Sequence, residues 1–167
     1  MARAKATAKT NAARMLDELG IPYTIHESEV DLSDLSAVAM ARKIGADPEQ
    51  VFKTLVARGD RTGVLMACLP GSAELDLKAL AQVSGNKHAE MVQLKEVQPL
   101  TGYLRGGCSP LGAKKPYPVF IDESAMLWDE IYVSAGQRGV QLKLAPDDLL
   151  RACQASYAPL ARTPHRP

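Results

Sequence analysis

The sequence predicts an α/β fold of the α+β type, in which helices surround a mixed, largely antiparallel, barrel-like β-sheet. Two observations support this fold class. Stretches with apolar residues at helical spacing alternate with short strand-like runs, and several of these runs are joined by glycine-containing turns that are typical of hairpins. A regular parallel βαβ array is less consistent with such hairpins. Since 167 residues suit one hydrophobic core, a single domain is expected.

The first half of the chain supplies two helices and a hairpin. Apolar residues at helical spacing, capping residues and closing glycines define the helices, and alternation or unbroken apolar runs define the strands. The expected elements are a helix at 10–20, a strand at 23–27, a helix capped by Ser33 or Asp34 and closed by Gly45, a cap with proline at 47–48, and a hairpin of strands at 51–57 and 64–69.

The second half alternates short strands with loops. The expected elements are a helix at 76–83, a strand at 88–92, a Gly/Pro-rich stretch, strands at 118–122, 130–134 and 140–144, and a last helix that opens at residues 145–148. We expect one domain at 10–160, a flexible N-terminal segment at 1–9 and a C-terminal tail at 161–167.

Composition excludes several classes of protein. The chain has 20 basic and 19 acidic residues, which is far from the basic footprint of a protein that grips nucleic acid over a large surface. No apolar run could span a bilayer and no secretory signal is visible, so a cytoplasmic protein without membrane contact is expected. Because Cys68, Cys108 and Cys153 are widely spaced, as are the histidines, we expect reduced thiols, no metal and no other cofactor.

Lys53 lies in the middle of a strand that reads as buried, VFKTLVA at 51–57. Strand alternation gives it apolar neighbours, and an unpaired ammonium there would be unfavourable or would have a lowered pKa. Two interpretations stay open. Either an anion or ligand pairs with Lys53, or the strand lies at an edge and the amine reaches water.

The stretch GYLRGGCSPLGAKK at 102–115 is the most unusual part of the chain. Its glycines permit close approach of the backbone to a ligand, and successive N–H groups can bind an anion, although an ordinary surface turn also explains them. A phosphate-binding P-loop is excluded because Ala113 stands where that motif needs lysine. Ser109 lacks the G-x-S-x-G elbow, and neither Cys108 nor His26 has a local catalytic partner.

A second glycine turn, SAGQRG at 134–139, joins two strongly strand-like runs. A hairpin needs glycine where φ is positive, which is a sufficient explanation for this turn. Ser134, at the end of a strand, could still present a hydroxyl to a pocket.

With these motifs assembled, the sequence resembles the YbaK/EbsC family of aminoacyl-tRNA deacylases, relatives of the editing domain inserted in bacterial prolyl-tRNA synthetases. The resemblance covers nearly the whole chain, and the double-glycine loop is its most specific element. It rests on VFKTL at 51–55, LDLKALA at 75–81, TGYLRGGCSPLGAKK at 101–115 and IYVSAGQRG at 131–139. It implies the fold of the prolyl-tRNA synthetase insertion domain.

The resemblance implies trans-editing, which is the removal of cysteine from mischarged Cys-tRNA(Pro), with Cys-tRNA(Cys) left open as a second substrate. Its partners would be aminoacylated tRNA(Pro) and, transiently, prolyl-tRNA synthetase. The substrate's own thiol would attack its ester carbonyl, so the protein would only position the substrate and polarise that carbonyl. The residues implied are Lys53 as the catalytic group, Thr54, Gly106, Gly107, Ser134, Gly136 and Ser28 for the substrate, and Lys114, Lys115 and Arg138 for tRNA phosphates.

Two positions depart from the family pattern: Ser28 stands where a tyrosine is expected and Gln141 where an aspartate is expected. Both changes concern the pocket, so substrate identity is less firmly implied than reaction class. The alternatives are a deacylase for another mischarged tRNA, a non-catalytic tRNA- or synthetase-binding module, and a small-molecule enzyme that uses the Cys108 thiol.

Overall fold

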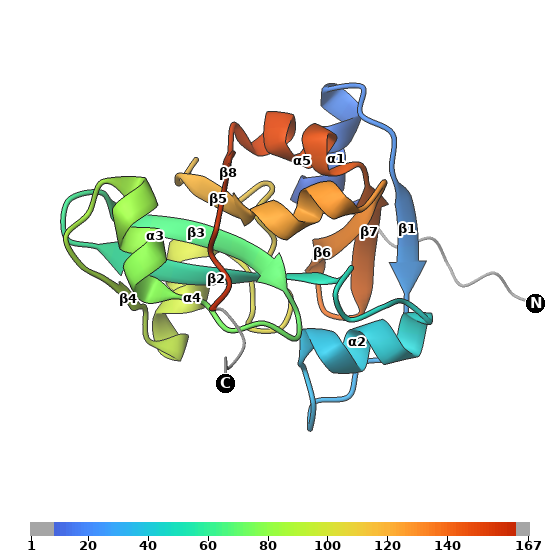
Figure 1. Cartoon of the computed structure of the whole chain (residues 1–167). Coiled ribbons are helices and arrows are strands. Elements are labelled where there is room, and N and C mark those ends of the chain that lie inside the picture. The colour runs from blue at the N-terminus through green and yellow to red at the C-terminus, as the bar shows by residue number, and fades with distance from the viewer. Residues whose placement is uncertain (1–8, 163–167) are drawn as a thin grey trace, which may run out of the picture.

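The computed structural model describes residues 9–162, which form two β-sheets with helices packed around them (Figure 1). Residues 1–8 and 163–167, which make up most of the two expected terminal segments, lie outside the described residues. The strands are β1 (Thr24–Glu27), β2 (Phe52–Gly59), β3 (Gly63–Pro70), β4 (Ala89–Met91), β5 (Val119–Asp122), β6 (Ile131–Gln137), β7 (Val140–Leu144) and β8 (Ser156–Ala158).

The two sheets differ in their pairing. The smaller sheet has the order β1-β7-β6 and is antiparallel, and the larger has the order β4-β2-β3-β5-β8. In the larger sheet β2 pairs antiparallel with β3 and β4, whereas β5 pairs parallel with β3 and β8. A bridge between Val51 and Tyr132 links the sheets. The expected fold class is confirmed, although no closed barrel forms within residues 9–162.

The helices begin and end at residues suited to these positions. Thr10 and Asp76 cap α1 and α3 through side-chain oxygens, and Gly45 and Gly85 adopt the left-handed conformation that ends α2 and α3. The helices are α1 (Asn11–Glu18), α2 (Ala37–Ile44), α3 (Leu77–Ser84), α4 (Leu94–Thr101), the 3₁₀ helix η1 (Glu123–Leu127) and α5 (Pro146–Cys153).

The start of α2 and the whole of α4 differ from expectation. Ser36 caps α2 in place of Ser33 or Asp34, because the Asp34 carboxylate accepts a hydrogen bond from the Ser36 amide and stabilises the preceding turn. Helix α4 was not predicted, since Pro99 lies inside it and proline normally interrupts a helix. Its capping box, from Gln93 and Glu96, starts the helix nonetheless.

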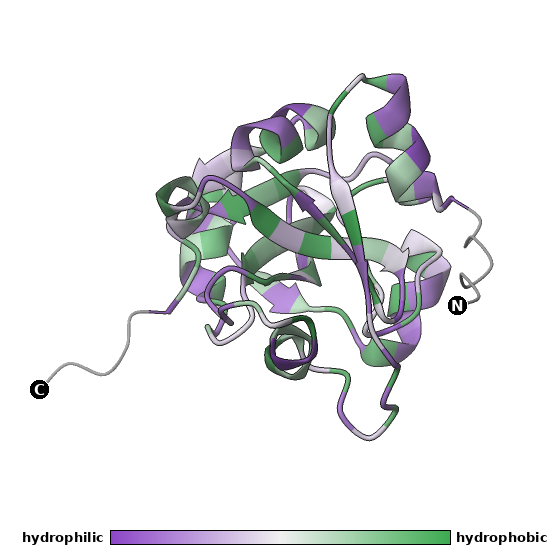
Figure 2. Ribbon diagram, turned by 90° about the vertical axis from the view of Figure 1, so that its right-hand side faces the viewer, coloured by the Kyte–Doolittle hydropathy of each residue, from purple (hydrophilic) through white to green (hydrophobic). Residues whose placement is uncertain are grey.

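Many strand residues are hydrophobic (Figure 2), and because successive residues of a strand point to opposite faces, apolar clusters pack on both sides of the larger sheet. On β2, Phe52 and Val56 face the main core between the two sheets, which also contains Ile131 and Leu142. On the other face, a smaller core packs beneath α3 and includes Ala57, Leu65, Leu69, Leu80 and Leu160. Successive residues of β2 therefore point into different environments.

Asp122, at the end of β5, holds the C-terminal part of the described chain against the sheet. Its carboxylate is buried and accepts hydrogen bonds from the amides of Leu160 and Ala161 at 2.8 and 2.9 Å. The same carboxylate accepts from the Ser124 hydroxyl at 2.5 Å. The chain beyond β8 is thus fixed by polar contacts as well as by the burial of Leu160.

We expect Asp122→Ala to lower the free energy of unfolding by about 3 kcal/mol, because buried N–H groups would lose their acceptor. Urea denaturation followed by circular dichroism would measure the change. Asp129→Ala, at an exposed position, is the matched control and should change stability little. Equal stabilities for the two variants would show that Asp122 is not a structural anchor.

Candidate active site

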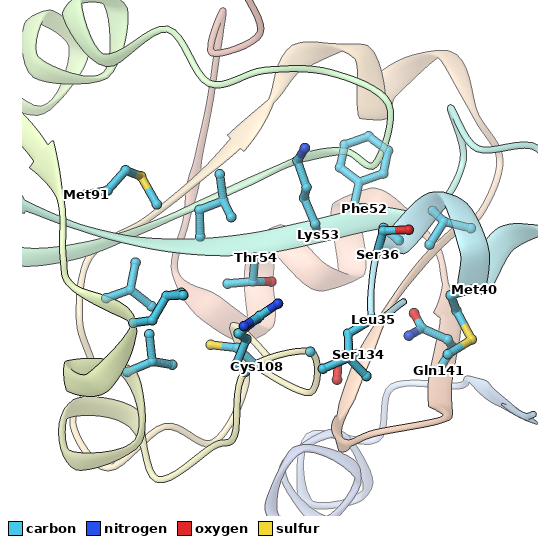
Figure 3. A pocket seen from close by; sticks show the side chains of 18 of the residues that line it. Leu35, Ser36, Met40, Phe52, Lys53, Thr54, Met91, Cys108, Ser134 and Gln141 are labelled. Carbon is cyan, nitrogen blue, oxygen red and sulfur yellow. The ribbon is translucent and has the colours of Figure 1, made fainter. Parts of the chain in front are cut away.

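A cavity of about 230 Å³ lies between β2, α2, α4 and the turn at 105–108 (Figure 3). Most of its wall is apolar. Leu35, Met40, Leu94 and Val97 come from the helices and the turn before α2, and the other residues are Ser36, Ala37, Val51, Phe52, Lys53, Thr54, Leu55, Val56, Met91, Val92, Arg105, Gly106, Cys108, Ser134 and Gln141. Few polar groups therefore decide what the cavity can bind.

Strand β2 presents Lys53 and Thr54 in opposite directions (Figure 3). Thr54 faces the side of Cys108, and its hydroxyl lies 3.6 Å from the Cys68 sulfur. The ammonium of Lys53 donates to the carbonyls of Gly71 and Ala73 at 3.1 and 2.5 Å. The lysine thus borders the cavity while its amine is bound by the loop between β3 and α3.

The electrostatics of Lys53 follow from this position. The side chain is half-buried, and burial lowers the pKa of its amine, while the nearby Glu74 carboxylate acts in the opposite direction. An ammonium has three N–H donors and two of them are used by the carbonyls. One donor is left for a further acceptor. The amine is therefore held by two backbone carbonyls, partners that neither of the two open interpretations of Lys53 named.

Gly106 and Gly107 form a turn that Ser134 ties to β6. Gly106 lines the cavity with φ at +85°, and a Cβ there would meet the Leu35 side chain at 3.0 Å. The Gly107 amide donates to Leu104, and its carbonyl accepts from the Ser134 hydroxyl at 2.9 Å. Ser134 also accepts from the Gly136 amide at 3.0 Å. Its hydroxyl is therefore a structural link between turn and sheet.

Gly136 lets the 101–115 loop approach β6 closely. Its φ is +96°, and a Cβ would lie 2.6 Å from the Tyr103 ring. Tyr103 in turn donates through its hydroxyl to the Leu111 carbonyl at 2.6 Å. Gly136 does not line the cavity, and its role is to leave room for the Tyr103 ring against β6.

Comparison with known families identifies the domain that contains this cavity. A sequence profile described as the aminoacyl-tRNA editing domain matches residues 34–152, a span that contains every residue lining the cavity. The chain belongs to this family. The editing domain accounts for most of the chain, from the turn before α2 to the end of α5.

Individual relatives agree with this assignment. EbsC of Enterococcus faecalis, described as a candidate Cys-tRNA(Pro)/Cys-tRNA(Cys) deacylase, is 45% identical and the match covers 95% of this chain and 96% of EbsC. The resemblance to the YbaK/EbsC family is thereby confirmed. A crystal structure of a candidate trans-editing enzyme for prolyl-tRNA synthetase matches 93% of this chain and 100% of its own, with 26% identity and a TM-score of 0.79.

The fold alone is also shared with a more distant structure. The hypothetical protein APE2540 is 19% identical and has a TM-score of 0.83, with 92% of this chain and 100% of that chain covered. The editing-domain fold is thus retained although most side chains differ.

The structure brings four of the residues implied by the resemblance to the cavity of the editing domain, namely Lys53, Thr54, Gly106 and Ser134. Gly107 and Gly136 do not line the cavity, and each is hydrogen-bonded to the Ser134 hydroxyl. Ser28 lies farther back and donates to the sulfur of Met40 at 3.1 Å, so it touches the cavity only through that side chain.

The three cations implied for tRNA phosphates lie outside the cavity lining. Lys114 donates to the Pro99 carbonyl at 3.2 Å and Arg138 donates to the Arg105 carbonyl at 2.8 Å. Lys115 is exposed. Sequence reasoning missed Arg105, which lines the cavity next to Gly106, and the α4 residues, because that helix was not predicted.

Cys108 lines the cavity but is poorly suited to nucleophilic catalysis. Burial raises the pKa of its thiol to about 11, so the thiol is protonated at neutral pH. His26 packs its ring edgewise against Tyr132 and does not line the cavity. Between residues 9 and 162, no group of three or more His, Cys, Asp or Glu is placed to hold a metal, and no helix there is long and apolar enough to cross a membrane.

Replacement of Ser134 should free the Gly136 amide, one of the two groups bonded to the Ser134 hydroxyl. We expect Ser134→Ala to speed exchange of the Gly136 amide hydrogen at least tenfold, because this amide loses its acceptor. Hydrogen exchange followed by NMR would measure it. Ser156→Ala, at an exposed strand position, is the control. Unchanged exchange at Gly136 would mean that the Ser134 hydroxyl does not hold this amide.

Proposed function

We propose that this protein is a trans-acting aminoacyl-tRNA deacylase whose substrates are Cys-tRNA(Pro) and Cys-tRNA(Cys). The observation that carries the proposal is the small apolar cavity bordered by Lys53 and Gly106, which lies wholly inside the editing-domain span. The description of EbsC as a candidate deacylase of these two tRNAs supports the choice of substrates. The active unit is the single domain at 10–160.

The size and polarity of the cavity support an aminoacyl group of modest size. At about 230 Å³ the cavity is smaller than the ~300–1,000 Å³ typical of sites for drug-sized ligands. Its apolar wall suits a small, weakly polar side chain such as that of cysteine. The aminoacylation site of a tRNA synthetase discriminates only modestly between such small amino acids, and this is the physical reason for a second, hydrolytic site.

Lys53 and Gly106 are assigned to polarise the ester. The free N–H of the Lys53 ammonium and the Gly106 backbone amide are the donors proposed for the charge that develops on the carbonyl oxygen. The Gly107 amide already donates to Leu104, so Gly107 contributes its carbonyl to the Ser134 link instead. Thr54 is assigned to the wall that holds the aminoacyl side chain.

The proposed reaction needs no nucleophile from the protein. The substrate's cysteine sulfur forms a bond to its own ester carbonyl carbon while the bond from that carbon to the tRNA ribose oxygen breaks. The thiol proton passes to the leaving ribose oxygen, which gives free tRNA and a cyclic thioester. Such an intramolecular attack gains from the effective concentration that positioning provides. A route without a protein nucleophile also agrees with the raised pKa of the Cys108 thiol, because a protonated thiol is a poor nucleophile.

Contacts with tRNA and a synthetase belong to the same proposal. Lys114, Lys115 and Arg138 are assigned to phosphates of the acceptor end, where they fix position without reading sequence. Because the chain has a net charge of only +1, prolyl-tRNA synthetase is proposed as a transient partner that contributes most of the tRNA affinity.

Lys53→Ala should lower single-turnover deacylation of Cys-tRNA(Pro) by at least ~100-fold, the usual effect of removing one donor to an oxyanion. Lys87→Ala, at an exposed position, is the control and should keep the parental rate. A Lys53→Ala variant that retained the parental rate would exclude the assigned role of the ammonium. Inactivity of the parent protein would instead favour a tRNA- or synthetase-binding module.

The thiol-assisted route predicts strong discrimination by side chain. We expect Cys-tRNA(Pro) to be deacylated at least ~100-fold faster than Ser-tRNA(Pro) and Ala-tRNA(Pro), because a hydroxyl is a far poorer nucleophile than a thiol and a methyl group is none. Parallel single-turnover assays would measure the three rates. Comparable rates for cysteine and serine would indicate attack by water and therefore a hydrolase with a different or broader substrate.

A further inference from the structure

Gln141 carries an unsatisfied oxygen in the wall of the cavity. Among the side chains of residues 9–162, its Oε1 is the one buried polar atom without a hydrogen-bond partner. The residue is 6% exposed, lies on β7 and lines the cavity. An unpaired buried acceptor destabilises a fold, so its presence beside a cavity points to a ligand that supplies the missing donor.

The other polar side chains of the cavity cannot take the same role as readily. Lys53 and Arg105 have donors only. The Ser134 hydroxyl is occupied by Gly107 and Gly136, and the Ser36 hydroxyl accepts from the Ala39 amide in the cap of α2. No Asp or Glu lines the cavity. The Thr54 hydroxyl pairs with the Cys68 sulfur at 3.6 Å, so among the polar side chains of the cavity Gln141 has the buried acceptor that lacks a partner.

Gln141 is also close to the proposed site of the ester. It pairs with Ser134 across β6 and β7, and Ser134 is bonded to the turn that contains Gly106. Figure 3 shows the Gln141 amide on the same side of the cavity as Ser134 and Met40. In an aminoacyl ester the amino group and the carbonyl sit on adjacent carbon atoms, so groups that recognise them must be neighbours.

We infer that Gln141 Oε1 accepts a hydrogen bond from the α-amino group of the bound aminoacyl ester and orients its carbonyl toward Gly106 and Lys53. The last torsion of a glutamine side chain is soft, so a turn of the amide directs Oε1 into the cavity. A neutral acceptor recognises the amino group without adding a charge to this apolar wall. The inference rests on the proposed deacylase function.

The test compares the parent and Gln141→Met on two substrates, Cys-tRNA(Pro) and 3-mercaptopropionyl-tRNA(Pro), which keeps the thiol and lacks the amino group. The quantity is the ratio of the two subsaturating single-turnover rates for each protein. Intrinsic reactivity of the two esters cancels when the ratios are compared. We expect the parent's ratio to exceed that of Gln141→Met by tenfold or more.

Three controls separate recognition from a structural role. Gln141→Met should keep or raise the Tm, because it removes an unpaired buried acceptor. Gln141→Glu, which retains an acceptor, should preserve the parent's ratio. Gln82→Met, at an exposed position of α3, should change neither ratio nor Tm.

The outcomes are distinguishable. Equal ratios for the parent and Gln141→Met would overturn the inference while leaving the deacylase function intact. A rate ratio for Gln141→Glu as low as that of Gln141→Met would also contradict the inference. Should Gln141→Met fail to fold, its lowered Tm would show that Gln141 has a structural role instead. If the parent left Cys-tRNA(Pro) intact, the proposed function itself would fail.

Discussion

The two-residue period of strand β2 is the constraint on which the cavity depends. Because successive side chains point to opposite faces, Lys53 and Thr54 lie on different sides of one strand. The face of Lys53 leads to α3 and the β3–α3 loop, whose carbonyls bind the ammonium. The face of Thr54 leads to the main core, and residues of both faces, Lys53 and Thr54 among them, line the cavity. A slip of one residue in the pairing with β3 would exchange these environments and abolish both arrangements.

The second requirement is a loop held firmly against the smaller sheet. Hydrogen bonds fix the 101–115 loop and its glycine turn. Tyr103 spans the loop to Leu111, and Ser134 joins the turn to β6. Gly136 makes room for the Tyr103 ring. Tyr103 and Gly136 support the cavity without lining it, which explains why sequence motifs mark them as strongly as the residues that do line it.

Much of this structure follows from local sequence signals. The hairpin of β2 and β3, helix α3 with Asp76 and Gly85 at its ends, and the strands around the second glycine turn were all predicted because turn residues and apolar periodicity act locally. Helix α4 was not predicted, since Pro99 opposes it and its packing beside the cavity outweighs that local effect. The strand β8 depends on pairing with β5, which is far away in sequence.

The site itself was predictable only where a family motif marks it. Lys53 and the double glycine could be identified in this way, but the carbonyl partners of the lysine come from the backbone, which no residue type reveals. The C-terminal chain adds a final consequence. Leu160 and Arg162 bond to Asp76 and Glu74, directly after the Ala73 carbonyl that holds Lys53. For protein engineering, this makes residues 160–162 a poor place to truncate the chain, because their loss would free the loop that holds the lysine.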